Sequence, residues 1–214
     1  MTRRSLLAVL AMAPAVHAQD AALVDAAARG DLSRVRALLA AGAALEQRDA
    51  RRRTALLAAT QGNHEAVALE LIARGADVNA QDDQQDSAFL LAGARGYTNI
   101  LRATLVAGAN LKSTNRYGGT ALIPACHYGH VETVRVLLGT AIDVNHVNNL
   151  GWTALLEAVI LGDGGPAHTE IVRLLIAARA NVNLADRQGV TPLQHAVQRN
   201  QATVAALLRA AGAR

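Results

Sequence analysis

Residues 51–82, RRRTALLAATQGNHEAVALELIARGADVNAQD, form the clearest unit of a pattern that recurs through most of the chain. Three residue classes mark the pattern, and each runs at intervals of 33 residues until a final interval of 38. The three classes are Gly30, Asn63, Gly96, Gly129, Gly162 and Asn200; Thr54, Ser87, Thr120, Thr153 and Thr191; and Asp49, Asp82, Asn115, Asn148 and Asp186. Independent classes that share one period and one irregularity indicate a repeat protein.

Each period predicts two short helices and a turn. The threonine or serine is the expected N-cap of the first helix, because its hydroxyl accepts an otherwise unpaired backbone N–H. The second helix carries branched apolar residues and ends at a left-handed glycine, as at Gly42, Gly75 and Gly108. The aspartate or asparagine then begins a β-hairpin-like turn by accepting from the backbone ahead of it. A helix pair this small cannot bury its apolar face alone, so the repeats must stack.

These residues resemble the ankyrin repeat, most clearly in residues 51–82 and in GVTPLQHAVQRN at 189–200. The resemblance covers about residues 20–214 and implies an all-α ankyrin-repeat solenoid, in which each 33-residue repeat is a helix-turn-helix plus a β-hairpin-like turn. Six repeats are expected, the first and last incomplete. Their bounds are near 20–49, 50–82, 83–115, 116–148, 149–186 and 187–214.

Departures from the family pattern predict local irregularities. Ala141 and Arg179 stand where a helix-end glycine is expected, so their turns should be strained or differently shaped. Pro124 lies four residues after the expected N-cap Thr120 and removes the first backbone bond of that helix. Five extra residues, within GDGGPAHTE at 162–170, predict a loop between the two helices of the fifth repeat. This insertion, 163–168, is either a second contact site or a tolerated surface change.

The first 18 residues, MTRRSLLAVLAMAPAVHA, have the features of a signal peptide. Arg3 and Arg4 precede an apolar run, and small residues before Gln19 suit cleavage after Ala18. The alternative is a buried first helix, because the run is too short to span a bilayer. We therefore expect a signal peptide at 1–18, an ankyrin-repeat domain at 19–214 and a periplasmic or secreted protein. With this segment and the insertion, the whole sequence resembles exported ankyrin-repeat proteins of bacteria, which implies a bacterial source. The pattern leaves open the general secretory and the twin-arginine routes.

Composition narrows the class of partner. The chain has 21 Lys and Arg against 17 Asp and Glu, and removal of Arg3 and Arg4 leaves 19 basic residues. A nearly neutral mature protein argues against nucleic acid as a partner. No later segment has the length and hydropathy of a membrane span, so no stable membrane insertion is expected after cleavage. No sequence motif points to a cofactor, and we expect a monomer that binds a partner protein.

The stretch TALIPACHYGH, residues 120–130, contains the only cysteine beside a histidine. A thiol-dependent enzyme using Cys126 and His127 is therefore an alternative function. The repeat places Cys126 at a small, inward-facing position and aligns His130 with His64, so both belong to the repeat frame. A zinc site needs more converging ligands, and a cysteine nucleophile needs an exposed, electropositive setting. The sequence thus predicts no enzyme and no metal site. The acidic stretch at 82–86 is too short for a calcium loop.

The resemblance implies that a partner binds the hairpin tips and the inner surface of the first helices. In a chain with 2% aromatic residues, the matching positions of the fourth and fifth repeats collect two of three tyrosines and the only tryptophan. Aromatic residues and arginine are the usual anchors of interfaces. The candidate partner-binding residues are Arg116, Tyr117, His127, Tyr128, Leu150, Trp152, Ile160 and Leu161. The alternative for Trp152 and Leu150 is that they cover their own hairpin.

The predicted function is an exported protein–protein interaction module, which binds a partner through its concave face and hairpin tips. An alternative within the binding class is an inhibitor or immunity-type protein that neutralises one toxic enzyme. Such a protein would capture its target tightly and one-to-one.

Overall fold

The computed structural model describes residues 22–214, so the predicted signal peptide at 1–18 lies outside the described residues. Within 22–214 the secondary structure is helical, without strands and with one isolated bridge between Arg48 and Thr54. Two compact units divide this part of the chain between Asp77 and Val78. Among the described helices, none combines the length and the hydropathy that a membrane crossing requires.

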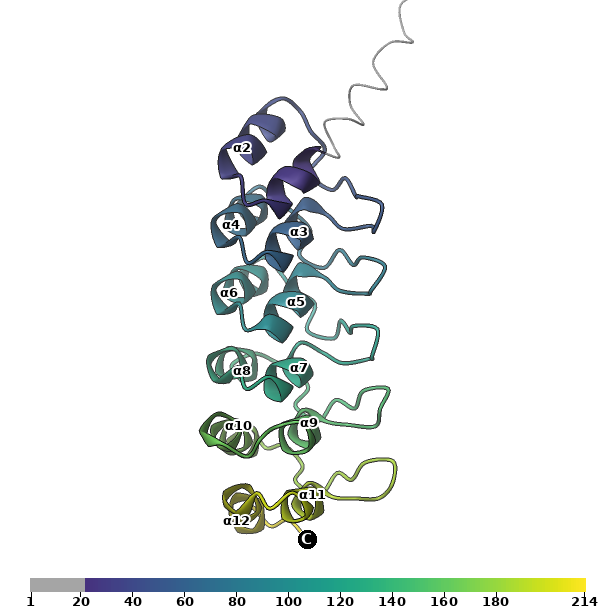
Figure 1. Cartoon of the computed structure of the whole chain (residues 1–214), viewed down its shortest axis with the longest axis vertical. Coiled ribbons are helices and arrows are strands. Elements are labelled where there is room, and N and C mark those ends of the chain that lie inside the picture. Colours follow the sequence, from purple (N-terminus) through teal and green to yellow (C-terminus); the bar gives the residue numbers. More distant parts are fainter. Residues whose placement is uncertain (1–21) are drawn as a thin grey trace, which may run out of the picture. The chain divides into compact units, whose positions relative to one another are not determined.

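The first unit contains two consecutive helix pairs (Figure 1). The helix of residues 22–28 precedes α2 (Leu32–Ala40), and α3 (Ala55–Gln61) precedes α4 (Glu65–Ala73). Alanine and leucine fill the interior, and every residue from Ala55 to Thr60 is buried. Small side chains allow short helices to approach each other closely, which explains why an apolar chain needs so few aromatic residues.

The second unit contains four consecutive helix pairs, each formed by a shorter first helix and an adjacent second helix. The pairs are α5 (Ala88–Arg95) with α6 (Thr98–Val106), α7 (Leu122–His127) with α8 (Val131–Leu138), α9 (Ala154–Ile160) with α10 (Pro166–Ala177), and α11 (Pro192–Gln198) with α12 (Ala202–Ala210). Within this unit the first helices stack in one column and the second helices in another, and the hairpins project beside the first column (Figure 1). The core lies between the two columns.

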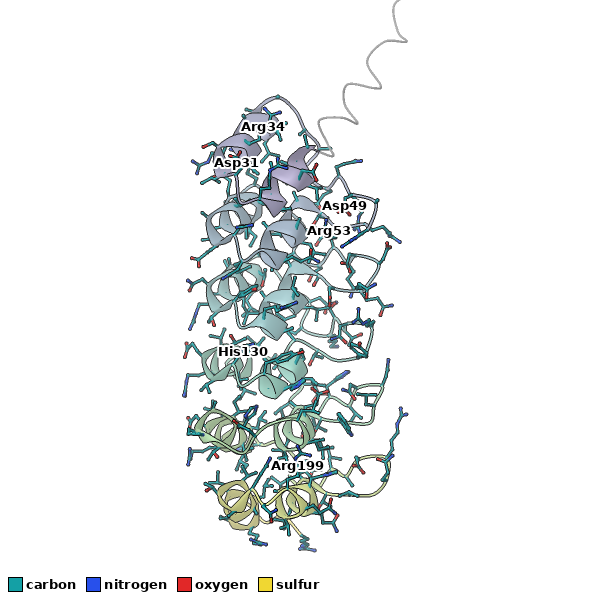
Figure 2. All side chains as sticks on the ribbon, in the orientation of Figure 1. Asp31, Arg34, Asp49, Arg53, His130 and Arg199 are labelled. Carbon is teal, nitrogen blue, oxygen red and sulfur yellow. The ribbon has the colours of Figure 1, made fainter. Side chains whose placement is uncertain are left out.

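Five hairpin turns are built alike, each by one aspartate or asparagine. At Asp49, Oδ1 accepts the backbone N–H groups of Arg51 and Arg53 at 2.9 Å each, and the Asp49 N–H donates to the Arg53 carbonyl at 3.0 Å. The Arg53 guanidinium also pairs with the Asp49 carboxylate at 2.7 Å (Figure 2). The same two side-chain bonds recur at Asp82, Asn115, Asn148 and Asp186. The predicted turn is confirmed.

The predicted hydroxyl N-cap is present in four of the five repeats that carry it. The oxygens of Thr54, Ser87, Thr153 and Thr191 each accept the backbone N–H three residues ahead, at 3.2 to 3.3 Å. At Thr191 the side chain of Gln194 also accepts the N–H of the cap, which completes a capping box. These bonds set the start of each first helix beside its hairpin.

The N-cap predicted at Thr120 is wrong, and Pro124 provides the reason. Proline has no N–H to donate to the Thr120 carbonyl, and the N–H of Ile123 bonds this carbonyl instead, at 3.2 Å. In the other four repeats the equivalent N–H, three residues after the cap, bonds the cap hydroxyl. Helix α7 therefore starts late, after Ala121 without a side-chain cap, and the buried Thr120 hydroxyl has no hydrogen-bond partner in the described structure.

The two second-helix ends that lack glycine adopt different solutions. Gly42, Gly75 and Gly108 have φ values of 86° to 90°, as predicted. Arg179 adopts the same left-handed region at φ 64°, which strains a residue with a Cβ atom. Ala141 keeps a negative φ, because the preceding Thr140 hydroxyl closes the turn by donating to the Leu137 carbonyl at 2.6 Å. The turn at Arg179 is thus strained, and the turn at Ala141 is differently shaped.

The insertion in the fifth repeat is more helical than predicted. Pro166 is the first residue of α10 rather than part of a loop, and α10 has 12 residues against nine in α6. Proline suits this position because its fixed φ matches the helix and its missing N–H would have no partner there. The chain turns at Gly164, with φ 69°, instead of at Gly162.

Candidate functional site

A groove of about 800 Å³ lies in the second unit, between the hairpins and the ends of the first helices. Its walls come from α5, α7 and α9 and from the turns that precede α7 and α9. We call it the central groove. Six of the eight candidate residues line it: Arg116, Tyr117, His127, Tyr128, Leu150 and Leu161. The other two do not: Trp152 is half-buried in its hairpin, and Ile160 is half-buried at the last residue of α9.

Hydrogen bonds between neighbouring hairpins place Tyr117 and Leu150 on the same wall. The backbone N–H of Asn149 donates to the Tyr117 carbonyl at 2.9 Å, and the His146 ring nitrogen Nε2 lies 2.7 Å from the Gly118 carbonyl. The two tips are thereby held in register. Tyr117 is 51% exposed and Leu150 is 48% exposed, so both present apolar surface to solvent.

Arg116 fixes the ring of Tyr117 without covering it. Its guanidinium carbon lies 4.8 Å from the centre of that ring, within cation–π range. The guanidinium donates to the Tyr117 hydroxyl at 3.1 Å and to the Gln84 side-chain oxygen. The bond to Tyr117 raises the pKa of Arg116, which keeps it charged. Because this cation is engaged on both sides, its main effect is to orient Tyr117.

His127 and Tyr128 form a second aromatic element at the end of α7. Their rings stack with centres 4.2 Å apart and planes 15° apart, and Tyr128 remains 60% exposed. Burial, and then the nearby His168, lower the pKa of His127, so its ring is neutral at pH 7. A stacked ring has fewer rotamers to lose when a partner covers it, which favours Tyr128 as an anchor.

Glu157, which the repeat pattern does not predict as a site residue, lies in the wall of the central groove on α9. Its side chain is only 7% exposed. Oε1 accepts a hydrogen bond from the Asn148 side-chain amide at 3.0 Å, and Oε2 lies 3.9 Å from Nδ1 of His127. Burial raises the pKa of Glu157 to about 7. The available signal was one acidic residue inside the apolar helix ALLEAVI, residues 154–160.

Cys126 is fully buried, as predicted for a small inward-facing residue. Burial, and secondarily the negative Glu157, raise the pKa of its thiol well above the usual value. A buried, protonated thiol is a poor nucleophile, which argues against the alternative of a thiol-dependent enzyme at Cys126 and His127. In the described residues no three His, Cys, Asp or Glu side chains gather as metal ligands would.

Comparison with known proteins decides the family. A family model described as ankyrin repeats, in three copies, matches residues 6–82, 88–165 and 145–214. The chain belongs to the ankyrin-repeat family. The described residues contain six helix pairs, whereas the family model matches in three longer stretches, so the number of ankyrin repeats stays a prediction.

Solved structures of ankyrin proteins match over nearly the whole chain. An ankyrin repeat domain from Acinetobacter baumannii is 55% identical with a TM-score of 0.87, over 90% of this chain and 98% of that one. A second ankyrin repeat protein is 36% identical with a TM-score of 0.85, over 89% and 97%. The ankyrin repeat domain of Bcl-3, a member of the IkappaB family, is 28% identical with a TM-score of 0.78, over 90% and 86%. A comparison with curated proteins found no match.

Side chains at the start of the second helices tie neighbouring ankyrin repeats together. In the first unit, Nε2 of His64 lies 2.9 Å from the Ala28 carbonyl. In the second unit, His130 (Figure 2) bonds the Ala94 carbonyl, while burial lowers the pKa of its ring. His130 therefore belongs to the repeat frame, as predicted from its alignment with His64.

His168 takes this bridging role in the fifth repeat, and the repeat pattern does not predict it. Its Nε2 lies 2.8 Å from the His127 carbonyl and its Nδ1 lies 2.8 Å from Oδ1 of Asp163. A backbone N–H from Gly165, followed by His168, lowers the pKa of the Asp163 carboxyl. The insertion moves this histidine away from its usual distance to the glycine, which hid it from the sequence pattern.

Proposed function

We propose that the chain binds a protein partner through the central groove, with Tyr117 and Tyr128 as its main anchors. Ankyrin repeats mediate protein–protein interactions, and the fold is typically a scaffold without catalytic activity. The observation that carries the proposal is the exposure of these two rings, 51% and 60%, in one groove of a chain with 2% aromatic residues. Large exposed rings in a concave site supply much apolar area at a small loss of side-chain entropy.

The supporting surface is compact and mixed in character. Leu150 and Leu161 are 48% and 41% exposed and line the same groove as the tyrosines. Asn148 and Glu157 provide polar groups in its wall. Apolar walls with a few fixed polar groups are the usual composition of an interface centre, where most of the binding energy is concentrated.

Affinity capture with the full chain tests this proposal. The tagged chain, isolated from its host, would be compared with Tyr128→Ala and with Val106→Ala for recovery of bound proteins. Val106 is a suitable control because it is 92% exposed at the end of α6 and does not line the groove. We expect Tyr128→Ala to lower the affinity for the partner about 30-fold, which is the loss expected for removing an anchor. Val106→Ala should keep the wild-type affinity.

Capture by all three proteins alike would contradict the proposal, since the partner would then bind elsewhere. The affinity and stoichiometry of the recovered complex also separate a general interaction module from an inhibitor of one toxic enzyme. An inhibitor of that kind requires one-to-one binding of very high affinity.

We further propose that the chain is exported, on the basis of the basic start, the apolar run and the small residues before Gln19. N-terminal sequencing of the protein isolated from its host should begin at Gln19. A protein that retains Met1 would contradict export by cleavage of this segment.

A further inference from the structure

Glu157 is an acidic residue that the repeat framework does not require. It lies nine residues after the turn residue Asn148. The equivalent residues are Ala58, Leu91 and Pro124 in three other repeats, and His195, which bonds its own turn residue Asp186, in the last repeat. The fold therefore accepts alanine, leucine or, with a late start to α7, proline at this position, and it does not need an acid there. Burial of a carboxylate is unfavourable unless its charge is paired, so an acid here needs an explanation beyond packing.

Other buried carboxylates in the second unit have structural partners that Glu157 lacks. Oδ1 of Asp186 accepts two backbone N–H groups and its Oδ2 lies 2.7 Å from Nε2 of His195. Asp82 is likewise bonded to two backbone N–H groups of its turn. Glu157 receives only the neutral amide of Asn148, and no Lys or Arg among residues 22–214 forms a salt bridge with it.

Given the proposed function, on which this inference rests, we infer that Glu157 recognises a basic side chain, Lys or Arg, that the partner protein inserts into the central groove. Oε2 accepts no hydrogen bond from the described residues, so it can accept one from an ammonium or guanidinium group. The pair would form out of bulk water, where a charge-assisted hydrogen bond is strong and a lone carboxylate is costly.

The walls around Glu157 match the rest of such a side chain. A Lys or Arg stem is apolar and packs well against Leu150 and Leu161, while its cation is attracted to the faces of Tyr117 and Tyr128. All four residues line the groove that also holds Glu157. Arg95 and Arg116 line it as well, and the Arg116 guanidinium is already bonded to Tyr117 and Gln84. An acidic partner residue would instead bring a second negative charge towards this carboxylate.

The groups that face Glu157 give the interaction a defined pH dependence. The Cys126 thiol and the His127 ring of α7 lie near Glu157, and His168 of α10 lies near His127. On α11, His195 is already paired with Asp186. Burial raises the pKa of Glu157 to about 7 and, together with His168, lowers that of His127. Raising the pH therefore ionises Glu157 and leaves the His127 ring neutral. The first adds a negative charge and the second removes a competing positive charge, so both favour a bound cation.

Selection from a random dodecapeptide display library on the immobilised full chain tests the inference. Selected peptides would be labelled, and their dissociation constants measured at pH 8 and pH 5.5 against the wild type, Glu157→Gln, Tyr128→Ala and Val106→Ala. We expect one conserved Lys or Arg in the selected peptides. Glu157→Gln should lower the affinity for these peptides at least tenfold at pH 8 and less than threefold at pH 5.5. Replacing the basic residue of the peptide by norleucine should lower its affinity for the wild type by the same factors.

The outcomes separate this inference from the proposed function. Peptides that depend on Tyr128 but show no basic residue, or bind Glu157→Gln as tightly as wild type at pH 8, overturn the role of Glu157 alone. Selection of acidic peptides overturns it as well. Peptides that bind Tyr128→Ala and wild type equally, or a library that yields no groove-dependent peptide, contradict the groove itself. Val106→Ala should bind like wild type throughout.

Discussion

Replacing Glu157 by glutamine should remove one contribution that makes the free energy of unfolding fall as the pH rises. Glutamine has the same shape, and its oxygen can still accept the hydrogen bond from Asn148, which is 3.0 Å in the wild type. The variant therefore removes the ionisable group while keeping the packing. The pKa of Glu157 is about 7 in the folded chain against an ordinary value of 4.5. Between these two values the folded chain binds more protons than the unfolded chain, so the stability of the wild type falls as pH rises through this window.

The size of the effect follows from the two pKa values. At 1.36 kcal/mol for each pKa unit, burial of the ionised acid costs about 3 kcal/mol at pH 8 and little at pH 4.5. His127 and His130 have lowered pKa values and change stability in the opposite sense, but both remain in the variant. The difference between the two proteins therefore isolates Glu157. Glu157→Gln should be about 3 kcal/mol more stable than wild type at pH 8 and nearly equal to it at pH 4.5.

Urea unfolding at pH 4.5 to 8, followed by fluorescence, measures this difference. The chain has one tryptophan, Trp152, which lies in the same repeat as Glu157 and reports its unfolding. The control is Glu132→Gln on α8, whose carboxylate is 59% exposed in surface ion pairs, so its loss should change stability by less than about 1 kcal/mol. If the free energies of unfolding of wild type and Glu157→Gln differed by the same amount at every pH, burial would not raise the pKa of Glu157 and the reasoning would be refuted.

Three further predictions concern stability and can be checked by urea unfolding followed by circular dichroism. Arg179→Gly should stabilise by about 0.5–1 kcal/mol, because φ is 64° there, while Ala141→Gly should destabilise by a similar amount; the opposite order would contradict the assigned turn shapes. Pro124→Ala should stabilise by about 1 kcal/mol, because the new N–H can bond the Thr120 carbonyl and free the Ile123 N–H for the buried Thr120 hydroxyl; no gain would show that this hydroxyl has another partner. Trp152→Ala should lower stability by about 1–3 kcal/mol and change partner affinity less than threefold, and a large loss of affinity would place this ring at the interface.

The sequence predicts the repeat frame well because the frame depends on local chemistry at fixed spacing. A hydroxyl at Thr54, an acid at Asp49 and a glycine at Gly75 each satisfy backbone groups within a few residues, so their roles can be inferred one period at a time. The exceptions arise where one residue changes the bonds of another. Pro124 is recognisable from the sequence as irregular. Its effect on the Thr120 cap is not, because that effect depends on the Ile123 N–H bonding the Thr120 carbonyl instead of the hydroxyl.

The site is less predictable because it depends on contacts between repeats. Tyr117 and Tyr128 were found from their positions in the period, and both line the central groove. Trp152 was selected in the same way, as the fourth residue after its turn residue, yet it is half-buried and does not line the groove. Glu157 was missed because a single acid in an apolar helix acquires its setting only from Asn148 and the neighbouring repeat. Such settings cannot be read from the spacing of residues along the chain.

Site-specific photo-cross-linking in the native host tests the central claim most directly. The photoreactive amino acid benzoylphenylalanine would replace Tyr128 in one strain and Val106 in another, and cells would be irradiated before the chain is recovered. Both positions are exposed, but only Tyr128 lines the central groove. We expect a covalent adduct with a partner protein from position 128 and none from position 106. An adduct from position 106 alone would contradict the account, since the partner would then cover another face of the second unit.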